Sequence, residues 1–150
     1  MGIEIAESLI TQNHHCPEQR LWRHVLLNAV EDTRITQSDR KSSICKMEAH
    51  DWITKENKDF TWICWQSGWD PEVVKEQYFK AVRKGNIVFT KRQIKWVEYY
   101  KLYLDLKNEK DAEKRQKLRK QVDSLRKKVL NTTTAVVKMF IVEENLVPCG

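Results

Sequence analysis

Few residues of this chain combine types and spacing that could support catalysis or metal binding. Residues 14–16, His-His-Cys, are metal-ligating types, but no second pair follows at zinc-finger spacing. Cys64 and His50 have the chemistry of a nucleophile and its base, although an apolar helix usually buries an inert thiol. His50 and His24 are isolated and are expected at the surface or the core boundary. GxSxG, Walker and HExxH motifs are absent, so we predict no enzyme, no metal and no cofactor.

Lysine and arginine side chains offer a different chemistry, the neutralisation of nucleic-acid phosphates. Candidates for phosphate contacts are Arg83, Lys84, Lys91, Arg92 and Lys95. Candidates for contacts to base edges, on the helix predicted after Asp70, are Lys75, Gln77 and Lys80. The same helix opens with Asp70, Glu72 and Glu76, and such carboxylates repel phosphates unless they accept a hydrogen bond from cytosine.

A second basic run follows: Lys114, Arg115, Lys117, Arg119, Lys120, Arg126, Lys127 and Lys128. Residues 91–130 hold 14 Lys and Arg against 6 Asp and Glu, so the basic character of the chain belongs to this segment. The run is either another phosphate-tracking face or the solvated side of an assembly helix, and the sequence slightly favours the second interpretation.

Residues 60–82 carry the pattern of a helix-turn-helix unit. Apolar residues at helical spacing flank Gly68: Phe60, Ile63 and Cys64 before it, and Val73, Val74 and Tyr78 after it. Aligned on this glycine, Cys64 takes the small-residue position and Val74 an apolar one. Gln77 falls where an apolar residue is usual, and glycine-joined helix pairs also occur in proteins that never contact DNA.

The large aromatic residues exceed what one core needs. Trp22 and Trp52 fall on core stripes, whereas the three tryptophans around the turn, at 62, 65 and 69, cannot all face one core. At least one is expected to be partly exposed, and Trp65 and Trp69 are the candidates for stacking on a base or docking a partner. Surplus apolar groups in the following segment predict self-association. The predicted assembly residues are Trp96, Tyr100, Tyr103, Leu118, Val122, Leu125 and Val129.

Helical spacing predicts the first elements that position these groups. A helix starts at Pro17 and carries an apolar stripe at residues 22, 25, 26, 29 and 30. A second runs to about Ile53 with apolar residues at 45, 49, 52 and 53, and Ser38 or Ser42 is its expected cap. Asp59 is the expected cap of a third, short helix.

The later elements have clearer boundaries. Asp70 and a following proline start the fourth helix, and Gly85 ends it. Thr90 and Gln93 match a capping box for a fifth helix from residue 91, and residues 108–110 are a candidate turn before a helix with a short coiled-coil seam. Residues 135–142 are the strongest strand candidate. Such a strand would pair with residues 86–89, with the N-terminal arm or with another subunit, and otherwise the segment is helical.

Composition agrees with a small helical protein. Of 150 residues 41% are apolar, and only 4 Gly and 3 Pro argue against a turn-rich β fold. The formal charge is +6, and four widely spaced cysteines are expected to be reduced. No apolar run approaches a membrane span and the N-terminus lacks signal-peptide features, so we predict a cytoplasmic protein without membrane contact.

The order Leu21-Trp22, Val25-Leu26, Ala29-Val30-Glu31-Asp32, Ala49, Trp52-Ile53, Phe60, Ile63-Cys64, Gly68, Asp70-Pro71 and Val74 resembles small helical proteins encoded by bacteriophages and prophages, notably of α-proteobacteria. The resemblance covers residues 17–84. It implies a helix-turn-helix or phage-regulatory protein, and hence DNA binding without a named target. A second resemblance, in layout alone, is to phage small terminase subunits, which assemble as rings on packaging DNA.

Together these observations predict a mainly α protein with an N-terminal arm (1–16), a helix-turn-helix domain (17–88), a basic helix or helix hairpin for assembly (89–131) and a C-terminal strand or tail (132–150). The expected function is DNA binding in transcription regulation by a phage or prophage protein, on double-stranded DNA and as a homo-oligomer. The alternatives are a small terminase subunit and a non-catalytic helical adaptor for a host or phage protein.

Overall fold

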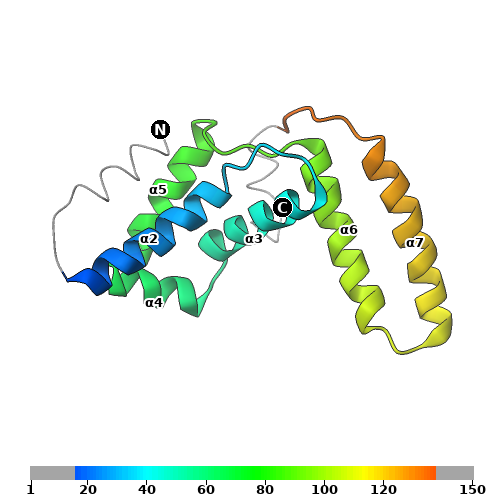
Figure 1. Ribbon diagram of the computed structural model, residues 1–150, viewed down its shortest axis with the longest axis horizontal. Coiled ribbons are helices and arrows are strands. Elements are labelled where there is room, and N and C mark those ends of the chain that lie inside the picture. Colours follow the sequence, from blue (N-terminus) through cyan, green and yellow to red (C-terminus); the bar gives the residue numbers. More distant parts are fainter. Residues whose placement is uncertain (1–15, 138–150) are drawn as a thin grey trace. The chain divides into compact units, whose positions relative to one another are not determined.

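A computed structural model of the protein describes residues 16–137, which are mainly helical (Figure 1). The helices in this range are α2 (Pro17–Asp32), α3 (Arg40–Thr54), α4 (Lys58–Gln66), α5 (Pro71–Arg83), α6 (Lys91–Asn108) and α7 (Ala112–Leu130). The described chain divides into two compact units. Unit 1 contains residues 16–35 and 45–88, and unit 2 contains residues 36–44 and 89–137, so α3 contributes to both. The prediction of a mainly α protein is confirmed.

Unit 1 buries apolar side chains from α2, α4, α5 and the C-terminal part of α3. The buried set in these helices is Leu26, Leu27, Ile53, Phe60, Cys64, Tyr78, Ala81 and Val82, and Ile87 joins it from the segment after α5. Phe60 is fully buried, and the Trp52 ring meets it edge-on with 5.2 Å between ring centroids. Most of these are apolar positions that helical spacing singled out, which confirms the predicted helices α2, α4 and α5.

α3 turns a different face to the core from the predicted one. Of the predicted stripe at residues 45, 49, 52 and 53, Ile53 is buried, whereas the other three are half-buried. Lys46 and His50 are buried instead, at 2% and 1% exposure. The expected surface position of His50 is therefore wrong, while His24 is exposed as expected. Hydrophobicity could not identify this face because its polar side chains find partners inside the unit.

Two helix starts confirm the predicted capping chemistry. Asp70 Oδ1 accepts a hydrogen bond from the Glu72 backbone N–H at 2.9 Å, and a proline occupies the first position of α5. At α6 the Thr90 hydroxyl accepts from the Gln93 N–H at 3.1 Å, and the Gln93 side chain accepts from the Thr90 N–H at 3.0 Å. These bonds satisfy amides that have no partner within the helix.

Two other caps differ from the prediction by one or two residues. Asn57, not Asp59, caps α4, because its side chain accepts from two backbone amides of the first turn. Asp59 lies inside that turn, where its negative charge interacts favourably with the positive end of the helix dipole. At α3 the cap is neither Ser38 nor Ser42, since Asp39 Oδ2 accepts from the Ser42 N–H at 3.1 Å. Hydrogen bonds from the Ser42 side chain and from the Ser42 backbone N–H lower the pKa of the exposed Asp39 carboxyl.

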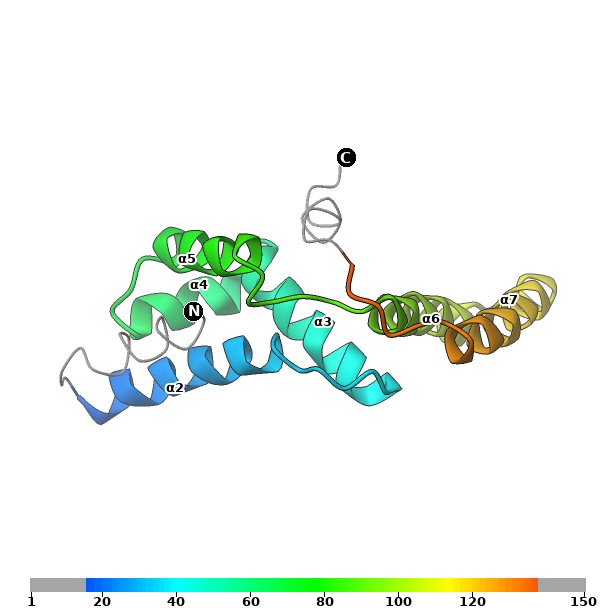
Figure 2. The ribbon, with the colours of Figure 1, turned by 90° about the horizontal axis from the view of Figure 1, so that it is seen from above.

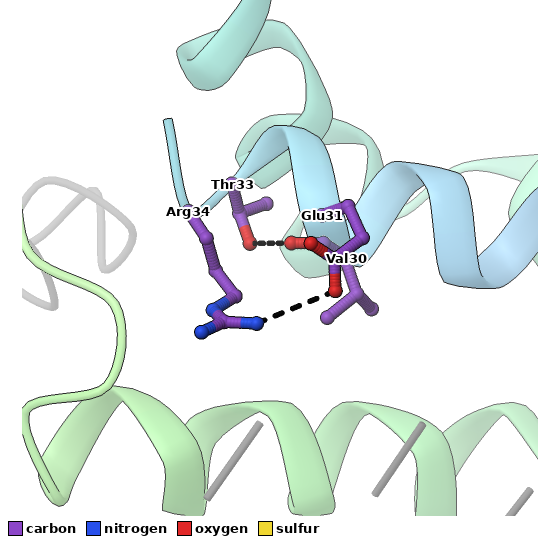
Figure 3. A network of polar contacts seen from close by, with 4 residues as sticks. All are labelled: Val30, Glu31, Thr33 and Arg34. Carbon is purple, nitrogen blue, oxygen red and sulfur yellow. Dashed lines mark hydrogen bonds and ion pairs between the residues drawn. The ribbon is translucent and has the colours of Figure 1, made fainter. Parts of the chain in front are cut away.

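A local polar network joins the last turn of α2 to the two residues that follow it (Figure 3). The hydroxyl of Thr33 donates to the backbone oxygen of Val30 at 2.5 Å, and Arg34 Nη1 lies 3.3 Å from Glu31 Oε1. Thr33 is fully buried although it is polar. Its bond back into the helix satisfies the hydroxyl where the chain leaves α2.

Unit 2 is dominated by a hairpin of α6 and α7, which run side by side in both views (Figure 1 and Figure 2). Tyr99, Val122 and Val129 form its buried seam, and four half-buried side chains pack against them: Trp96, Leu102, Leu106 and Leu125. The Trp96 ring meets Tyr99 edge-on at 5.5 Å between centroids. Of the two predicted arrangements, a basic helix or a helix hairpin, the structure has the hairpin, and its turn is at residues 109–111, one residue later than the predicted 108–110.

The predicted C-terminal strand is described only at its beginning. Val137 N–H donates to the Phe89 backbone oxygen at 2.8 Å, and Lys91 N–H donates to the Ala135 oxygen at 2.9 Å. Thr90 and Val136 form an isolated antiparallel bridge, so no longer ladder is present within residues 16–137. The rest of the predicted strand, like residues 1–15 of the predicted arm, lies outside the described residues.

The turn between α4 and α5 depends on a glycine. Gly68 has φ +80°, a conformation that residues with a Cβ rarely adopt. A Cβ at this position would also overlap Nε2 at the end of the Gln19 side chain on α2. The turn therefore lies against the Gln19 side chain of α2, whose flexible end would have to move to admit a Cβ, and the backbone conformation is the main reason for a glycine at this position.

We expect Gly68→Ala to lower the free energy of unfolding by about 1–2 kcal/mol from the backbone conformation, with a further loss from the Gln19 contact. Urea unfolding of the full chain measures this. Adding Gln19→Ala should recover the contact part and leave the backbone part; Gln19 Oε1 makes no hydrogen bond within residues 16–137 that this change would remove. Stability of Gly68→Ala equal to that of the unchanged protein would contradict the interpretation.

Candidate functional site

The corner between α4 and α5 is the best-defined feature among the predicted functional groups. Residues 67–70 join the two helices, and Trp69 N–H donates to the Cys64 backbone oxygen at 3.0 Å. Cys64 is fully buried beneath this corner. Burial raises the pKa of its thiol to about 12, so it holds its proton at neutral pH and cannot act as a thiolate.

The three predicted base-contact residues of α5 differ in how far they reach solvent. Lys75 is half-buried, with its ammonium 5.7 Å from the centroid of the Phe60 ring. Gln77 is also half-buried and lines an apolar cavity. Lys80 is exposed, with its ammonium 3.9 Å from Glu76 Oε1. Lys80 is therefore the one member of this set on the open surface of unit 1.

Charge is segregated along the exposed face of α5. Residues 72, 76, 80 and 83 recur at helical spacing and all are exposed. The first two are glutamates, whereas the last two are Lys80 and Arg83, and the exposed Lys84 follows at the C-cap. The negative end of the face coincides with the start of the helix and the positive end with its finish, where cations also favour the helix dipole.

The predicted phosphate contacts in unit 2 have varied surroundings. Lys91 is exposed in the first turn of α6, and Lys95 pairs with Glu98 at 3.0 Å. Arg92 donates from Nε to the Thr132 backbone oxygen at 3.0 Å and from Nη2 to that of Leu130 at 3.4 Å. Its guanidinium is therefore engaged in hydrogen bonds to the end of α7 and the segment after it. A substitution of Arg92 would disturb these contacts and could not test phosphate binding alone.

The predicted assembly residues fall into two groups. Val122 and Val129 are buried in the hairpin seam, and Trp96 and Leu125 pack against it, so the chain itself covers these four. Tyr100 and Leu118 are half-buried, and Tyr103 is 37% exposed. The hairpin thus supplies the second helix that the surplus aromatic residues required.

The tryptophans near the corner confirm that one or more is exposed. Trp62 and Trp65 on α4 are 51% and 59% exposed. Trp22 of α2 meets Trp62 edge-on at 4.9 Å between centroids. Trp69 is half-buried beneath Arg23, whose guanidinium carbon lies 4.6 Å from the ring centroid. Arg23 Nε also donates to the Ser67 backbone oxygen at 3.0 Å, so this arginine ties α2 to the corner.

An apolar cavity of about 210 Å³ lies in unit 1 beside the same corner. Side chains of α2, α3, α4 and α5 line it, including Leu26, Ile53, Phe60, Trp69, Val73 and Tyr78. Asp70 and Gln77 are among its few polar neighbours. Its chemistry suits apolar groups and offers no set of side chains for acid–base work.

Two buried polar contacts were not foreseen from the sequence. His50 Nδ1 lies 2.6 Å from the Tyr78 hydroxyl, and burial lowers the pKa of His50 to about 4. Burial also raises the pKa of Tyr78 well above its usual range. Lys46 Nζ donates to the backbone oxygens of Ile35, at 2.7 Å, and Val88. Burial lowers the pKa of Lys46 to about 8.

His50 should make the stability of the protein pH-dependent. Its pKa falls from 6.5 in the unfolded chain to about 4 in the folded one, so protonation of the unfolded state costs stability as the pH drops between these values. The largest expected loss is on the order of 3 kcal/mol. Urea unfolding at several pH values should show a smaller loss in His50→Gln, whose amide can still meet Tyr78. Equal losses in both proteins would rule out His50 as the source.

Within residues 16–137 no group of three His, Cys, Asp or Glu side chains gathers to hold a metal ion. Residues 14 and 15 of the His-His-Cys segment lie outside the described residues. No described helix has the length and apolar character to cross a membrane. Comparison with known protein families, characterised proteins and solved structures finds no match to this chain.

Proposed function

We propose that this protein binds double-stranded DNA through α5, the second helix of the α4–α5 pair, and acts in transcription regulation as a phage- or prophage-type helix-turn-helix protein. The observation that carries the proposal is the positive end of α5. Lys80, Arg83 and Lys84 lie together on the exposed C-terminal end of α5, the second of two capped helices that a short, glycine-dependent turn joins. Cations grouped on one rigid element are what phosphate contacts require.

The charge pattern indicates which part of α5 meets DNA. Glu72 and Glu76 make the first half of the exposed face unfavourable near phosphates. Lys75 and Gln77 are half-buried, which limits their reach to base edges. Lys80 is the remaining candidate for a base contact, and Arg83 and Lys84 would bind the backbone. The proposed interface is therefore the C-terminal half of α5, dominated by phosphate contacts.

Fluorescence anisotropy with random-sequence duplex DNA at about 50 and about 200 mM salt tests the proposal. The variant Lys80→Gln/Arg83→Gln/Lys84→Gln should lose at least about tenfold in affinity at the lower salt. Its salt slope should fall by about 3 if each removed cation contacts one phosphate.

The matched control is Arg20→Gln/Lys55→Gln/Lys58→Gln, which removes the same charge from other exposed positions of unit 1. Helix content and thermal unfolding verify that both variants fold. Equal losses of DNA affinity in the two variants would show that only the net charge of the protein matters, and not the position of the cations. Undiminished binding by the α5 variant would refute the proposed interface.

The exposed tryptophans favour a second candidate function, a helical adaptor for a protein partner. Trp62 and Trp65 present large aromatic side chains on α4, and such side chains dominate binding energy at protein interfaces. Salt separates the two functions: phosphate binding weakens steeply as salt rises, whereas an apolar interface does not. Absence of DNA binding at low salt would move the adaptor to first place.

A further inference from the structure

The arginines and the lysines of α7 lie on different faces of the helix. Its three arginines, Arg115, Arg119 and Arg126, fall within an arc of about 40° at 3.6 residues per turn, whereas its lysines occupy the rest of the exposed surface. All three arginines are exposed. In the described part of the chain none of their guanidinium groups forms an ion pair or a hydrogen bond. A helix that needed only solubility has no reason to place every arginine on one flank.

The arginine flank is held in a fixed orientation by the hairpin. Val122 and Val129 are buried against α6, so the apolar seam of α7 is occupied and the helix cannot roll. Arg115 to Arg126 covers about 16 Å at 1.5 Å per residue. That length faces roughly five base-pair steps of a duplex at 3.4 Å each.

α6 contributes aromatic and basic groups to the same side. Because α6 and α7 are right-handed and antiparallel, residues displaced from the seam in the same rotational sense lie on the same side of the hairpin. Tyr103 and Lys107 are displaced in this sense on α6, as the arginines are on α7. Tyr103 stacks on Tyr99 at 6.4 Å between centroids, and the Arg40 guanidinium lies 5.4 Å from the Tyr103 ring.

This surface, the arginine face, comprises Arg40, Tyr103, Lys107, Arg115, Arg119 and Arg126. The carboxylate beside it is Asp123, three residues before Arg126 and four after Arg119, and it forms no ion pair within residues 16–137. Arginine presents a planar fork that binds phosphate oxygens two at a time, which a lysine ammonium cannot do. The face therefore matches a repeating array of phosphates.

We propose that the arginine face of the α6–α7 hairpin is a second DNA-contact surface, whose contacts to the phosphate backbone of duplex DNA add to those of α5. It goes beyond the proposed function because it lies in unit 2 and needs none of the α5 cations. A membrane surface is the less favoured target. The apolar residues with which a basic amphipathic helix would enter lipid are buried in the seam.

The test uses the full chain, random-sequence duplex DNA and fluorescence anisotropy at two salt concentrations. Arg115→Gln/Arg119→Gln/Arg126→Gln should weaken binding at low salt at least about tenfold and reduce the salt slope by about 3. The matched control, Lys117→Gln/Lys120→Gln/Lys128→Gln, removes the same charge from other faces of the same helix and should lose much less. Arg→Lys at the three positions keeps the charge and should lose an intermediate amount, because the fork is gone.

The same arginine changes in the Lys80→Gln/Arg83→Gln/Lys84→Gln background separate this proposal from the proposed function. Binding that survives the α5 changes and disappears with the arginines supports the arginine face even if the α5 interface fails. Equal losses in the arginine and lysine variants overturn it, as does unchanged DNA binding without the arginines. Arginine-dependent binding to phosphatidylserine vesicles with no effect on DNA would assign the face to lipid instead. Circular dichroism confirms that each exposed-site variant is folded.

Discussion

A buried lysine is a central constraint on the architecture of unit 1. Lys46 places its ammonium between the backbone oxygens of Ile35 and Val88, which end the two stretches of chain that form the unit. A buried cation is costly unless acceptors surround it, so these two segments must stay where their carbonyls meet it. The same requirement fixes the rotation of α3. Turning that helix by one residue would expose Lys46 and separate His50 from Tyr78.

This constraint explains where sequence reasoning succeeded and where it failed. α2, α5 and the hairpin follow the spacing of apolar residues, and Asp70 and Thr90 mark helix starts by side-chain chemistry that acts within one turn. The buried face of α3 does not follow the spacing of apolar residues, because the groups that contact the buried Lys46 and His50 belong to residues far away in the sequence. No hydrophobicity pattern contains those partners. The misplaced caps have a smaller cause: Asn57 and Asp39 compete with equally suitable neighbours only one or two positions away.

The candidate site also has features that local residue types predict and features that depend on residues far away in the sequence. Residue types at 64, 68 and 70 predicted the corner, since a buried small residue, a left-handed glycine and a capping carboxylate are all local requirements. The availability of each cation was not predictable. Arg92 binds the backbone oxygens of Leu130 and Thr132, although it was a candidate for phosphate contacts in sequence. The neutral Gln77, at a position where the helix-turn-helix pattern usually has an apolar residue, lines a cavity. Whether a charged side chain is free to meet a ligand depends on long-range contacts that the sequence order does not reveal.

The arginines of α7 illustrate what a structure adds to a charge count. In sequence the basic run is one block of eight lysines and arginines, and solubility alone accounts for such a block. Once the seam of the hairpin is known, the block separates into an arginine flank and a lysine remainder. The net charge is the same whether the run is treated as one block or divided by face, but only the division shows that the arginines point to one side of the helix. A directional array of forked donors selects phosphate geometry, whereas a uniform cationic surface attracts any anion, so the distribution of arginine carries information that the total charge does not.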